Sequence, residues 1–412
     1  MSELLIRPGH NDHLVVADLL APSAGAVLLP HARPPISRLV LDAPLAAREP
    51  QFREAAQDAG VPLLIDVLSP LLQAEIDRAD AWAKLPFARA EAVSTEMLAN
   101  PFFQTKLVEE TVQFQIESGA SAIIPPYLYA ETPHDPAFEA SLAMIALTAK
   151  YLRQNSMVLP LFVVLCVQRR GFASQRTWHD GIERFARTAV DVGPQALGLC
   201  VSPMGSGEEK LSTVLSTFTM AQRLKDTGAR VVAWRQGFYG PGLVAAGLDG
   251  YETGIGLREA TNIANLRSAR KPRIPDPAKR KRAASAGIYM PGLGRSLSRD
   301  VATMLFEHHV LRSQLVCDDR RCCPKGASST LEDPRPHAVR ARARQLRHID
   351  SMPHTAWRLH DVSKDAYAAA LLASKANEVL ATAGQTTRIK TAGYEALAQT
   401  ADLLGQNHQA IA

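Results

Sequence analysis

Three of the five cysteines in this 412-residue chain lie close together, at Cys317, Cys322 and Cys323. A histidine, His348, follows them on a predicted basic helix. Thiolates this close in a reduced protein usually share a metal ion, and structural zinc accepts three cysteines and one histidine. The sequence therefore predicts a structural Zn²⁺ site formed by Cys317, Cys322, Cys323 and His348, with His337 as the alternative fourth ligand.

Acidic residues lie at the ends of several short apolar runs. Asp42 and Asp66 follow two neighbouring runs, and Glu252 lies in a later one. Two carboxylates in one apolar-walled site can have different pKa values, so they can divide nucleophilic and acid/base roles between them. For each acid alone, a helix cap or a loop salt bridge is a more ordinary explanation than catalysis. We expect Glu252, Asp66 and Asp42 to be the catalytic candidates.

The elements that would position these acids alternate along the chain. Eight apolar runs predict strands, and amphipathic patterns between them predict helices. The predicted strands are residues 37–44, 62–69, 120–129, 158–167, 197–203, 230–237, 250–256 and 287–292. An open, doubly wound sheet would show the same alternation, but no Gly-x-Gly-x-x-Gly turn follows the first run. We expect an α/β fold, a (β/α)₈ TIM-like barrel, with its site at the carboxyl ends of the strands.

Four regions follow from this pattern. Residues 1–36 are expected to form an N-terminal cap segment, residues 37–310 the barrel and residues 311–350 a zinc-binding helical insertion. Residues 351–412 are expected to form an Ala-rich C-terminal helical tail. Such a tail suits an outer helical layer or a dimer contact, so a homodimer or a partner protein is a further expectation.

Charge and hydropathy indicate where the protein is located and what it binds. The chain lacks an apolar run of the roughly 20 residues that a membrane span requires, and its start lacks the pattern of a secretory signal, so we expect a cytoplasmic protein. The net charge is only +5, but basic residues are concentrated after residue 266. Such a concentration of positive charge is typical of proteins that bind the phosphate backbone of nucleic acids. A solvated linker beside a charged helix face would also give this charge distribution. The candidate nucleic-acid contacts are Arg267, Arg270, Lys271, Arg273, Lys279, Arg280, Lys281, Arg282, Arg340 and Arg344.

A family resemblance rests on two segments. Residues 237–252 read GFYGPGLVAAGLDGYE, which resembles the tRNA-guanine transglycosylase pattern of a glycine turn, a short helix and then Gly-x-Asp-x-aromatic-Asp. Gly198 and Leu199 occupy the places of that family's glycine- and leucine-containing base-recognition strand. The three cysteines and the later histidine also follow in the family's order.

The resemblance implies a base exchange on tRNA or DNA through a covalent carboxylate–ribose intermediate. Glu252 takes the place of the family's nucleophilic aspartate, and the Ser-Gly-Gly-Phe-Gln loop that carries the second catalytic aspartate is absent here. The family spaces its cysteines as C-x-C-x-x-C, whereas this chain has C-x-x-x-x-C-C. The expected substrate-binding residues are Gly198, Leu199, Ser202, Tyr127, Trp234, Arg235 and Gln236.

Two other functions fit the same residues. The first is a non-catalytic, zinc-containing barrel that binds nucleic acid within a multi-protein system. The second is an unrelated barrel enzyme that uses Arg169, Arg170 and Arg235 to hold a small anionic substrate.

Overall fold

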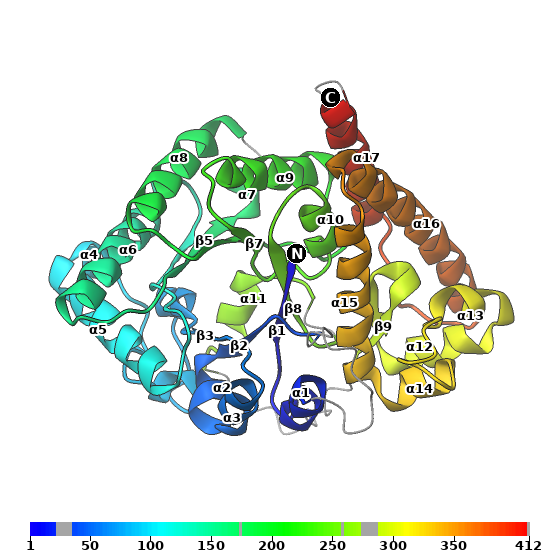
Figure 1. Cartoon of the computed structure of the whole chain (residues 1–412), viewed down its shortest axis with the longest axis horizontal. Helices are drawn as coiled ribbons and strands as arrows, with labels where there is room; N and C mark the ends of the chain where they lie inside the picture. Colours follow the sequence, from blue (N-terminus) through cyan, green and yellow to red (C-terminus); the bar gives the residue numbers. More distant parts are fainter. Residues whose placement is uncertain (22–34, 173–174, 257–258, 273–286, 410–412) are drawn as a thin grey trace.

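The computed structural model describes residues 1–21, 35–172, 175–256, 259–272 and 287–409. Eight parallel strands form one sheet in the order β3-β2-β1-β8-β7-β6-β5-β4. The strands are β1 (Glu3–Arg7), β2 (Arg38–Asp42), β3 (Leu63–Asp66), β4 (Tyr129–Ala130), β5 (Phe162–Gln168), β6 (Ala196–Ser202), β7 (Val231–Ala233) and β8 (Gly250–Gly254). Isolated parallel bridges join Leu64 to Ala122 and Ile123 to Leu161, so the segment before β4 connects β3 with β5. The sheet thus curls into the expected TIM-like barrel (Figure 1).

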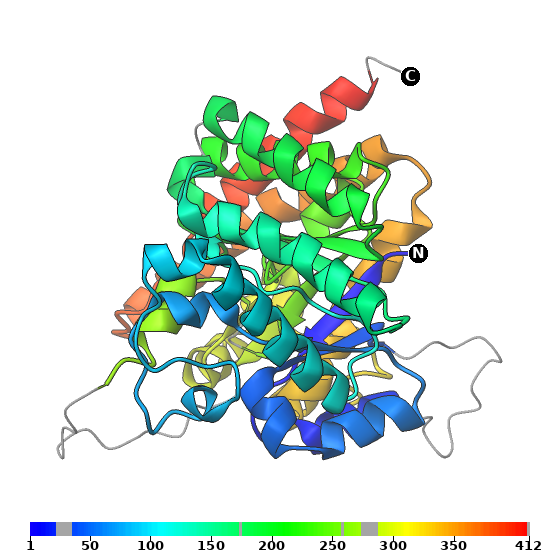
Figure 2. The same ribbon diagram turned by 90° about the vertical axis from the view of Figure 1, so that its left-hand side faces the viewer.

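Helices surround this sheet (Figures 1 and 2). Those between the strands are α1 (His13–Leu20), α2 (Ala43–Arg48), α3 (Gln51–Asp58), η1 (Ser69–Gln73), η2 (Trp82–Lys84), α4 (Thr95–Ala99), α5 (Pro101–Glu117), α6 (Pro136–Gln154), α7 (Arg169–Phe172), α8 (Gln175–Asp191), α9 (Leu211–Lys225) and α10 (Gly240–Ala245). Local sequence explains their starts: before α6, the Asp135 carboxylate accepts a hydrogen bond from the amide of Ala137, and Pro136 occupies the first turn.

A second group of elements follows β8. It contains α11 (Ile263–Ser268), β9 (Ile288–Met290), η3 (Pro291–Leu293), β10 (Arg295–Leu297), α12 (Arg299–Glu307), α13 (His309–Leu315), α14 (Ala327–Glu332), α15 (Pro334–Ser351), α16 (Thr355–Thr382) and α17 (Ala392–Gln409). The helices α16 and α17 pack against each other, and α17 also contacts α9 of the barrel. The expected helical tail is therefore present. None of the helices in the described ranges is long and apolar enough to cross a membrane.

Two strand assignments from the sequence are wrong. The sequence predicts a cap segment over Glu3–Arg7, but these residues form β1, which pairs in parallel with both β2 and β8. The apolar run of β1 is only Leu4–Ile6, too short to stand out from its polar neighbours. The predicted eighth strand at 287–292 contains β9, which pairs antiparallel with β10 outside the barrel.

Two layers of buried apolar side chains stabilise the barrel. Residues on one face of the strands fill its interior, among them Phe162, Cys166, Cys200 and Trp234. Alternate residues such as Leu165 and Leu199 belong instead to the larger core between the strands and the helices. This alternation follows from the two-residue repeat of a strand, and it determines which side chains can reach a site inside the barrel.

The pairing of β1 with β8 predicts an intolerance of side chains at Gly250. A Cβ atom there would lie 2.5 Å from the carbonyl oxygen of Glu3, its partner residue. We expect Gly250→Ala to lower the free energy of unfolding by about 1–3 kcal/mol through forced displacement of β1. Gly405→Ala in α17 is the control, because its Cβ would meet Leu359 at an ordinary 3.8 Å. Chemical denaturation of both variants measures the difference, and equal stability would argue against β1 in the sheet.

Candidate active site and metal centre

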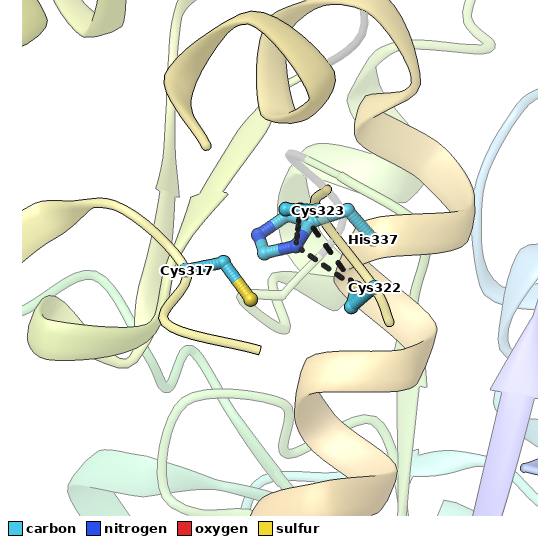
Figure 3. Close-up of side chains that lie close together, drawn as sticks. All are labelled: Cys317, Cys322, Cys323 and His337. Carbon is cyan, nitrogen blue, oxygen red and sulfur yellow. Dashed lines mark hydrogen bonds between the residues drawn. The ribbon is translucent and has the colours of Figure 1, made fainter. Parts of the chain in front are cut away.

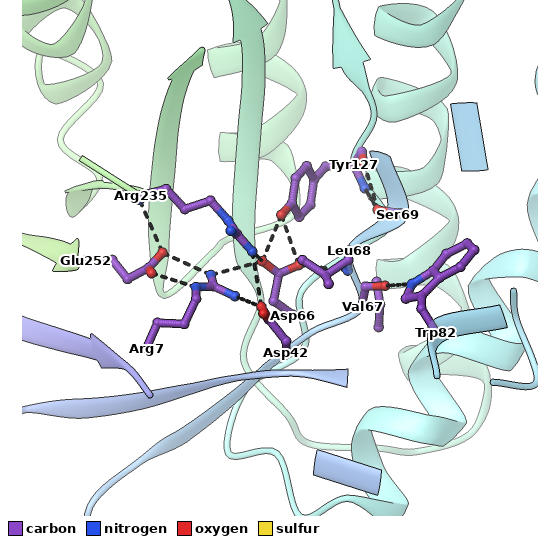
Figure 4. A network of polar contacts seen from close by, with 10 residues as sticks. All are labelled: Arg7, Asp42, Asp66, Val67, Leu68, Ser69, Trp82, Tyr127, Arg235 and Glu252. Carbon is purple, nitrogen blue, oxygen red and sulfur yellow. Dashed lines mark hydrogen bonds and ion pairs between the residues drawn. The ribbon is translucent and has the colours of Figure 1, made fainter. Parts of the chain in front are cut away.

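The three predicted catalytic acids converge at the carboxyl edge of the sheet (Figure 4). Asp42 and Asp66 are the last residues of β2 and β3, and they are paired in the strand register. Glu252 lies in β8, on the other side of β1. A residue that the sequence did not single out, Arg7 at the end of β1, lies between them and contacts all three carboxylates.

Arg7 is the centre of this cluster. Its Nε and Nη2 atoms donate to the two carboxylate oxygens of Glu252 at 2.7 and 3.0 Å. Nη2 also lies 3.0 Å from Asp66 Oδ2, and Nη1 pairs with Asp42. Burial alone would lower the pKa of Arg7, but the negative charges, that of Glu252 first, raise it well above its usual value. Arg7 therefore stays charged and holds the acids of three strands together.

Arg235 forms the second cationic contact. Its Nη2 atom lies 3.0 Å from Asp66 Oδ2 and 3.2 Å from Asp42 Oδ1. Its own backbone amide donates to Glu252 Oε2 at 3.2 Å. The residue has a φ of 57°, in the left-handed region that non-glycine residues seldom occupy. Such strain persists where surrounding contacts fix the backbone, and it is common at functional sites.

Tyr127 fixes the orientation of Asp66. Its hydroxyl donates to both carboxylate oxygens of Asp66 at 2.9 Å, and the amide of Leu68 donates to one of them at 2.9 Å. Burial, followed by the charge of Asp66, raises the pKa of Tyr127 well above its usual value, so the hydroxyl keeps its proton. A substrate-binding role would require its ring to be open to a base, but the side chain is buried and bonded to Asp66.

Only one of the three acids reaches solvent appreciably. The side chain of Asp42 is 20% exposed, compared with 0% for Asp66 and 1% for Glu252. Three carboxylates face two guanidinium groups, so the formal charge of the cluster is −3 + 2 = −1. A site of this sign suits a substrate that develops positive charge at the reacting atoms.

The ion pairs of Arg7 predict a large stability effect. Arg7→Met would leave Asp66 and Glu252 buried with less compensation, and removing one partner of a buried ion pair typically costs about 3–5 kcal/mol. We expect Arg7→Met to lower the free energy of unfolding by about this amount. The matched variant Arg89→Met breaks a part-exposed pair with Glu110 and should cost no more than about 1 kcal/mol. Similar losses in the two variants would contradict a central role for Arg7.

The expected base-recognition strand has a mainly structural role in this conformation. A Cβ on Gly198 would lie 3.1 Å from the ring of Phe162 and 3.4 Å from the Cβ atom of Trp234, so the glycine makes room for these two side chains. Leu199 belongs to the core between strands and helices rather than to the barrel interior. The Ser202 hydroxyl accepts a hydrogen bond from the amide of Ile263 at 2.8 Å.

Trp234 and Gln236 flank Arg235 after β7, and both are buried. The guanidinium of Arg7 lies 5.2 Å from the ring centroid of Trp234, which gives a cation–π contact. Gln236 donates to the carbonyl oxygen of Val201 at 2.8 Å. Within the described residues, Trp234 Nε1 and Gln236 Oε1 have no hydrogen-bond partner. The indole N–H of Trp234 and the amide oxygen of Gln236 are therefore available to form hydrogen bonds with a ligand.

A second centre lies outside the barrel (Figure 3). Ligand atoms of Cys317, Cys322, Cys323 and His337 all lie within 4.8 Å of one another. The two Sγ atoms of Cys322 and Cys323 are 3.8 Å apart, and His337 Nδ1 lies 3.5 and 3.3 Å from them. With Zn–S bonds of about 2.3 Å and Zn–N bonds of about 2.0 Å, a tetrahedral site has edges of about 3.8 and 3.5 Å. The donor set and its spacing therefore fit zinc.

The chain around these residues explains how adjacent cysteines can share one ion. The amides of Cys322 and Cys323 both donate to the carbonyl oxygen of Asp319, which forms a tight turn. His337 Nε2 lies 2.9 Å from the carbonyl oxygen of Tyr289, so this nitrogen carries the proton and leaves Nδ1 free to bind a metal. Hydrogen bonds from Cys322 and Cys323 lower the pKa of Cys317, and hydrogen bonds to Cys317 and Cys323 raise the pKa of Cys322. The metal-free cluster therefore favours a thiolate at Cys317, and a bound metal would displace the proton of Cys322.

His348 is not part of this centre, which corrects the predicted ligand set. Its ring is exposed and bonds to Asp361 at 3.0 Å. The prediction rests on the order of three cysteines and a later histidine, which this chain shares with the resembled family. The helix α15 begins at Pro334, so His337 lies in its first turn beside the cysteines, whereas His348 lies near its other end. The shared order therefore does not identify the histidine ligand, and only the donor types, three cysteines and one histidine, agree with the family.

The predicted nucleic-acid contacts divide into three groups. Arg267, Arg270 and Arg344 are held within the chain, by the carbonyl of Gln73, by Asp80 and by Asp318 respectively. Lys271 and Arg340 are exposed. The remaining residues lie outside the described part of the chain: Arg273, Lys279, Arg280, Lys281 and Arg282.

The alternative anion site receives little support. Arg235 is already paired with two aspartates. Arg169 lies 3.6 Å from the buried carboxylate of Glu209, while Arg170 is exposed. These three cations therefore do not form a common site in this structure.

Comparisons with known proteins show a distant structural likeness only. No protein-family model matches the chain, and no curated protein matches it either. The carboxyl transferase domain of Rhizobium etli pyruvate carboxylase is 9% identical with a TM-score of 0.36, and the match covers 98% of this chain and 61% of that one. The (S)-3-O-geranylgeranylglyceryl phosphate synthase of Thermoplasma acidophilum is 9% identical with a TM-score of 0.30, covering 66% and 93%. Likeness at this level does not assign an activity or a substrate.

Proposed function

We propose that the chain exchanges a base at the glycosidic bond of a nucleoside within tRNA or DNA, with Glu252 as the nucleophile. The observation that carries this proposal is the convergence of three strand-end carboxylates on Arg7, with a net charge of −1. Glycosidic cleavage passes through a transition state in which the sugar carries positive charge, and a negatively charged carboxylate cluster stabilises it. The resemblance of residues 237–252 to the tRNA-guanine transglycosylases agrees with this chemistry.

The contacts of Glu252 favour Oε1 as the attacking atom. Oε2 accepts hydrogen bonds from Arg7 Nη2 and from the amide of Arg235, whereas Oε1 accepts one from Arg7 Nε. A carboxylate oxygen has two lone pairs, so Oε1 keeps one available for attack. This oxygen would form a bond to the anomeric carbon while the carbon–nitrogen bond to the base breaks and its electron pair leaves with the base.

Asp42 is the better candidate for the second carboxyl group. The departing base must gain a proton, and the incoming base must lose one when it displaces Glu252 from the sugar. Asp66 accepts hydrogen bonds from Tyr127 and Leu68 and is fully buried, which suits a positioning residue. Asp42 has an exposed edge and shares Arg7 and Arg235 with the cluster, so it can exchange protons with solvent. Protonated Asp42 would act as the acid in a formally neutral cluster, and transfer of its proton to the departing base would restore the charge of −1 and leave Asp42 as the base.

The proposal is tested by incubating the purified protein with radiolabelled guanine and, separately, tRNA, single-stranded DNA or duplex DNA. We expect label to enter one of these polymers and a fraction of the protein to remain attached to it on a denaturing gel. Absence of both label and adduct with all three polymers would contradict base exchange.

One observation favours a second candidate, a non-catalytic nucleic-acid-binding barrel. Asp66 and Glu252 are almost completely buried by their ion pairs, as in a cluster that serves only to hold strands together. This candidate predicts polymer binding without label incorporation, so the same incubation separates the two functions.

Both candidates predict salt-sensitive binding of nucleic acid. The run Lys279–Arg280–Lys281–Arg282 contains four consecutive cations. Each phosphate that the protein no longer neutralises reduces the slope of log K against log salt by about 0.7–0.9. We expect replacement of all four by alanine to reduce the slope measured by fluorescence anisotropy by up to about 2.8–3.6 units. Replacing exposed Lys364 of α16 should leave the slope unchanged, and an unchanged slope in the quadruple variant would remove this run from the interface.

A further inference from the structure

A cavity of about 520 Å³ lies between the barrel and the C-terminal helices, away from the acid cluster. Residues of α10 and η3 form one wall, and residues of α13, α15, α16 and α17 form the others. Figure 1 shows α10 beside α15 and α16, and contacts between these helices bring the walls together. Small-molecule sites have volumes of about 300–1,000 Å³, so the cavity is large enough for a ligand of one or two rings.

The inner part of the cavity is apolar. Its lining includes Phe238, Leu293, Leu372, Tyr394 and Leu397. The hydroxyl of Tyr394 already donates to the carbonyl oxygen of Leu293 at 2.7 Å, so this residue contributes mainly its ring. A ligand with a planar or apolar body would gain from burial against these side chains.

The outer part of the cavity is negatively charged. It is lined by Asp318, Arg344, His348, Asp361 and Asp365. The three aspartates and one arginine give a formal charge of −3 + 1 = −2 when His348 is neutral. Arg344 pairs with Asp318 at 2.7 Å, so Asp318 already balances its positive charge.

Asp361 and Asp365 provide the unbalanced charge. They are four residues apart on α16, so they lie on the same face of the helix. Asp361 accepts a hydrogen bond from His348 at 3.0 Å, whereas Asp365 has no salt-bridge partner in the part of the chain that the structure describes. Desolvation of its carboxyl group, followed by repulsion from Asp361, raises the pKa of Asp365. A positive group between these carboxylates would relieve that repulsion.

We propose that this cavity is a binding site for a small organic cation, with an apolar or aromatic body against Phe238 and Leu372 and an ammonium or guanidinium group against Asp361 and Asp365. The site is separate from the acid cluster and does not depend on base exchange. It also accounts for two residues that the sequence assigned elsewhere, since His348 and Arg344 line its polar part.

Three indole compounds that differ in one group test the proposal: tryptamine, which is cationic, tryptophol, which is neutral, and indole-3-propionate, which is anionic. We expect isothermal titration calorimetry with the full chain at low salt to show tryptamine binding at least tenfold more tightly than indole-3-propionate, with tryptophol between them. Equal binding of the three compounds, or no binding of tryptamine at millimolar concentration, would overturn the proposal.

Two variants locate the site. Asp361→Asn with Asp365→Asn should reduce tryptamine affinity at least tenfold and leave tryptophol affinity unchanged. Ala369→Phe should fill the cavity and remove binding of both compounds. The controls are Glu378→Gln and Ala381→Phe, which change exposed positions of α16 outside the cavity and should bind like the wild type. If Ala369→Phe fails to fold, the aspartate pair decides the outcome alone, and wild-type tryptamine affinity in that pair would place the ligand elsewhere.

Discussion

Cys322→Ser combined with Cys323→Ser is expected to yield a protein without zinc and with a markedly lower melting temperature. Structural zinc contributes its binding free energy directly to folding, about 10–16 kcal/mol in isolated zinc-finger peptides. The centre joins the turn at Asp319 to α15 and, through His337, to the backbone of β9. We expect a loss of at least about 2 kcal/mol, which lowers the melting temperature of a cooperative unit of this length by at least about 2–3 °C. Elemental analysis and calorimetry measure the two effects.

Two histidine variants provide the control for this result. His337→Ala should release the metal, because His337 Nδ1 completes the donor set. His348→Ala should retain one equivalent, because its ring lies with Asp361 instead. Retention of zinc by His337→Ala and its loss from His348→Ala would reverse the ligand assignment. An absence of zinc from freshly purified, reduced wild-type protein would contradict the metal centre itself.

Glu252→Gln is expected to fold, keep its metal and lose base exchange by at least about 10³-fold, with no covalent adduct. The amide is nearly the same shape as the carboxylate but is a far weaker nucleophile, and it removes one negative charge from the cluster. Single-turnover incorporation of labelled guanine gives the rate, and a denaturing gel detects the adduct. Full exchange activity in the folded variant would exclude Glu252 as the nucleophile.

A matched variant separates this loss from a loss of structure. Glu3→Gln changes another carboxylate of the same sheet, which pairs with Arg38 at 2.9 Å and Arg230 at 3.1 Å. Glu3 begins β1, so it lies at the opposite end of the barrel from the acid cluster. We expect Glu3→Gln to lose some stability and to retain exchange activity. Similar losses of activity in both variants would indicate damage to the barrel rather than to the chemistry.

Sequence reasoning found the acids of the site because their position follows from the fold. The carboxyl ends of parallel strands meet at one edge, so Asp42 and Asp66 could be placed together once their strands were recognised. Arg7 was missed because its strand was missed. A signal was present: the apolar run Leu4–Ile6 is bounded by charged residues and followed by Pro8 and Gly9. Its short length gave no repeat from which to recognise a strand.

The metal centre shows a different limit on prediction from sequence. The residue types identified the donors, but the choice between His337 and His348 depended on where α15 begins and how it packs. Pro334 begins the helix, and a tertiary contact of His337 Nε2 with the carbonyl oxygen of Tyr289 at 2.9 Å orients the imidazole toward the cysteines. Spacing in the sequence could not supply that information.

The place of β1 has a consequence for the order of folding. Arg7 and Glu252 are separated by 245 residues, and β1 pairs with both β2 and β8. During synthesis the first strand is made long before β8, so its second neighbour is missing until most of the barrel has left the ribosome. Contacts between segments so far apart in the sequence form late and slowly. The acid cluster therefore forms only when β1 pairs with β8, so its formation coincides with completion of the barrel.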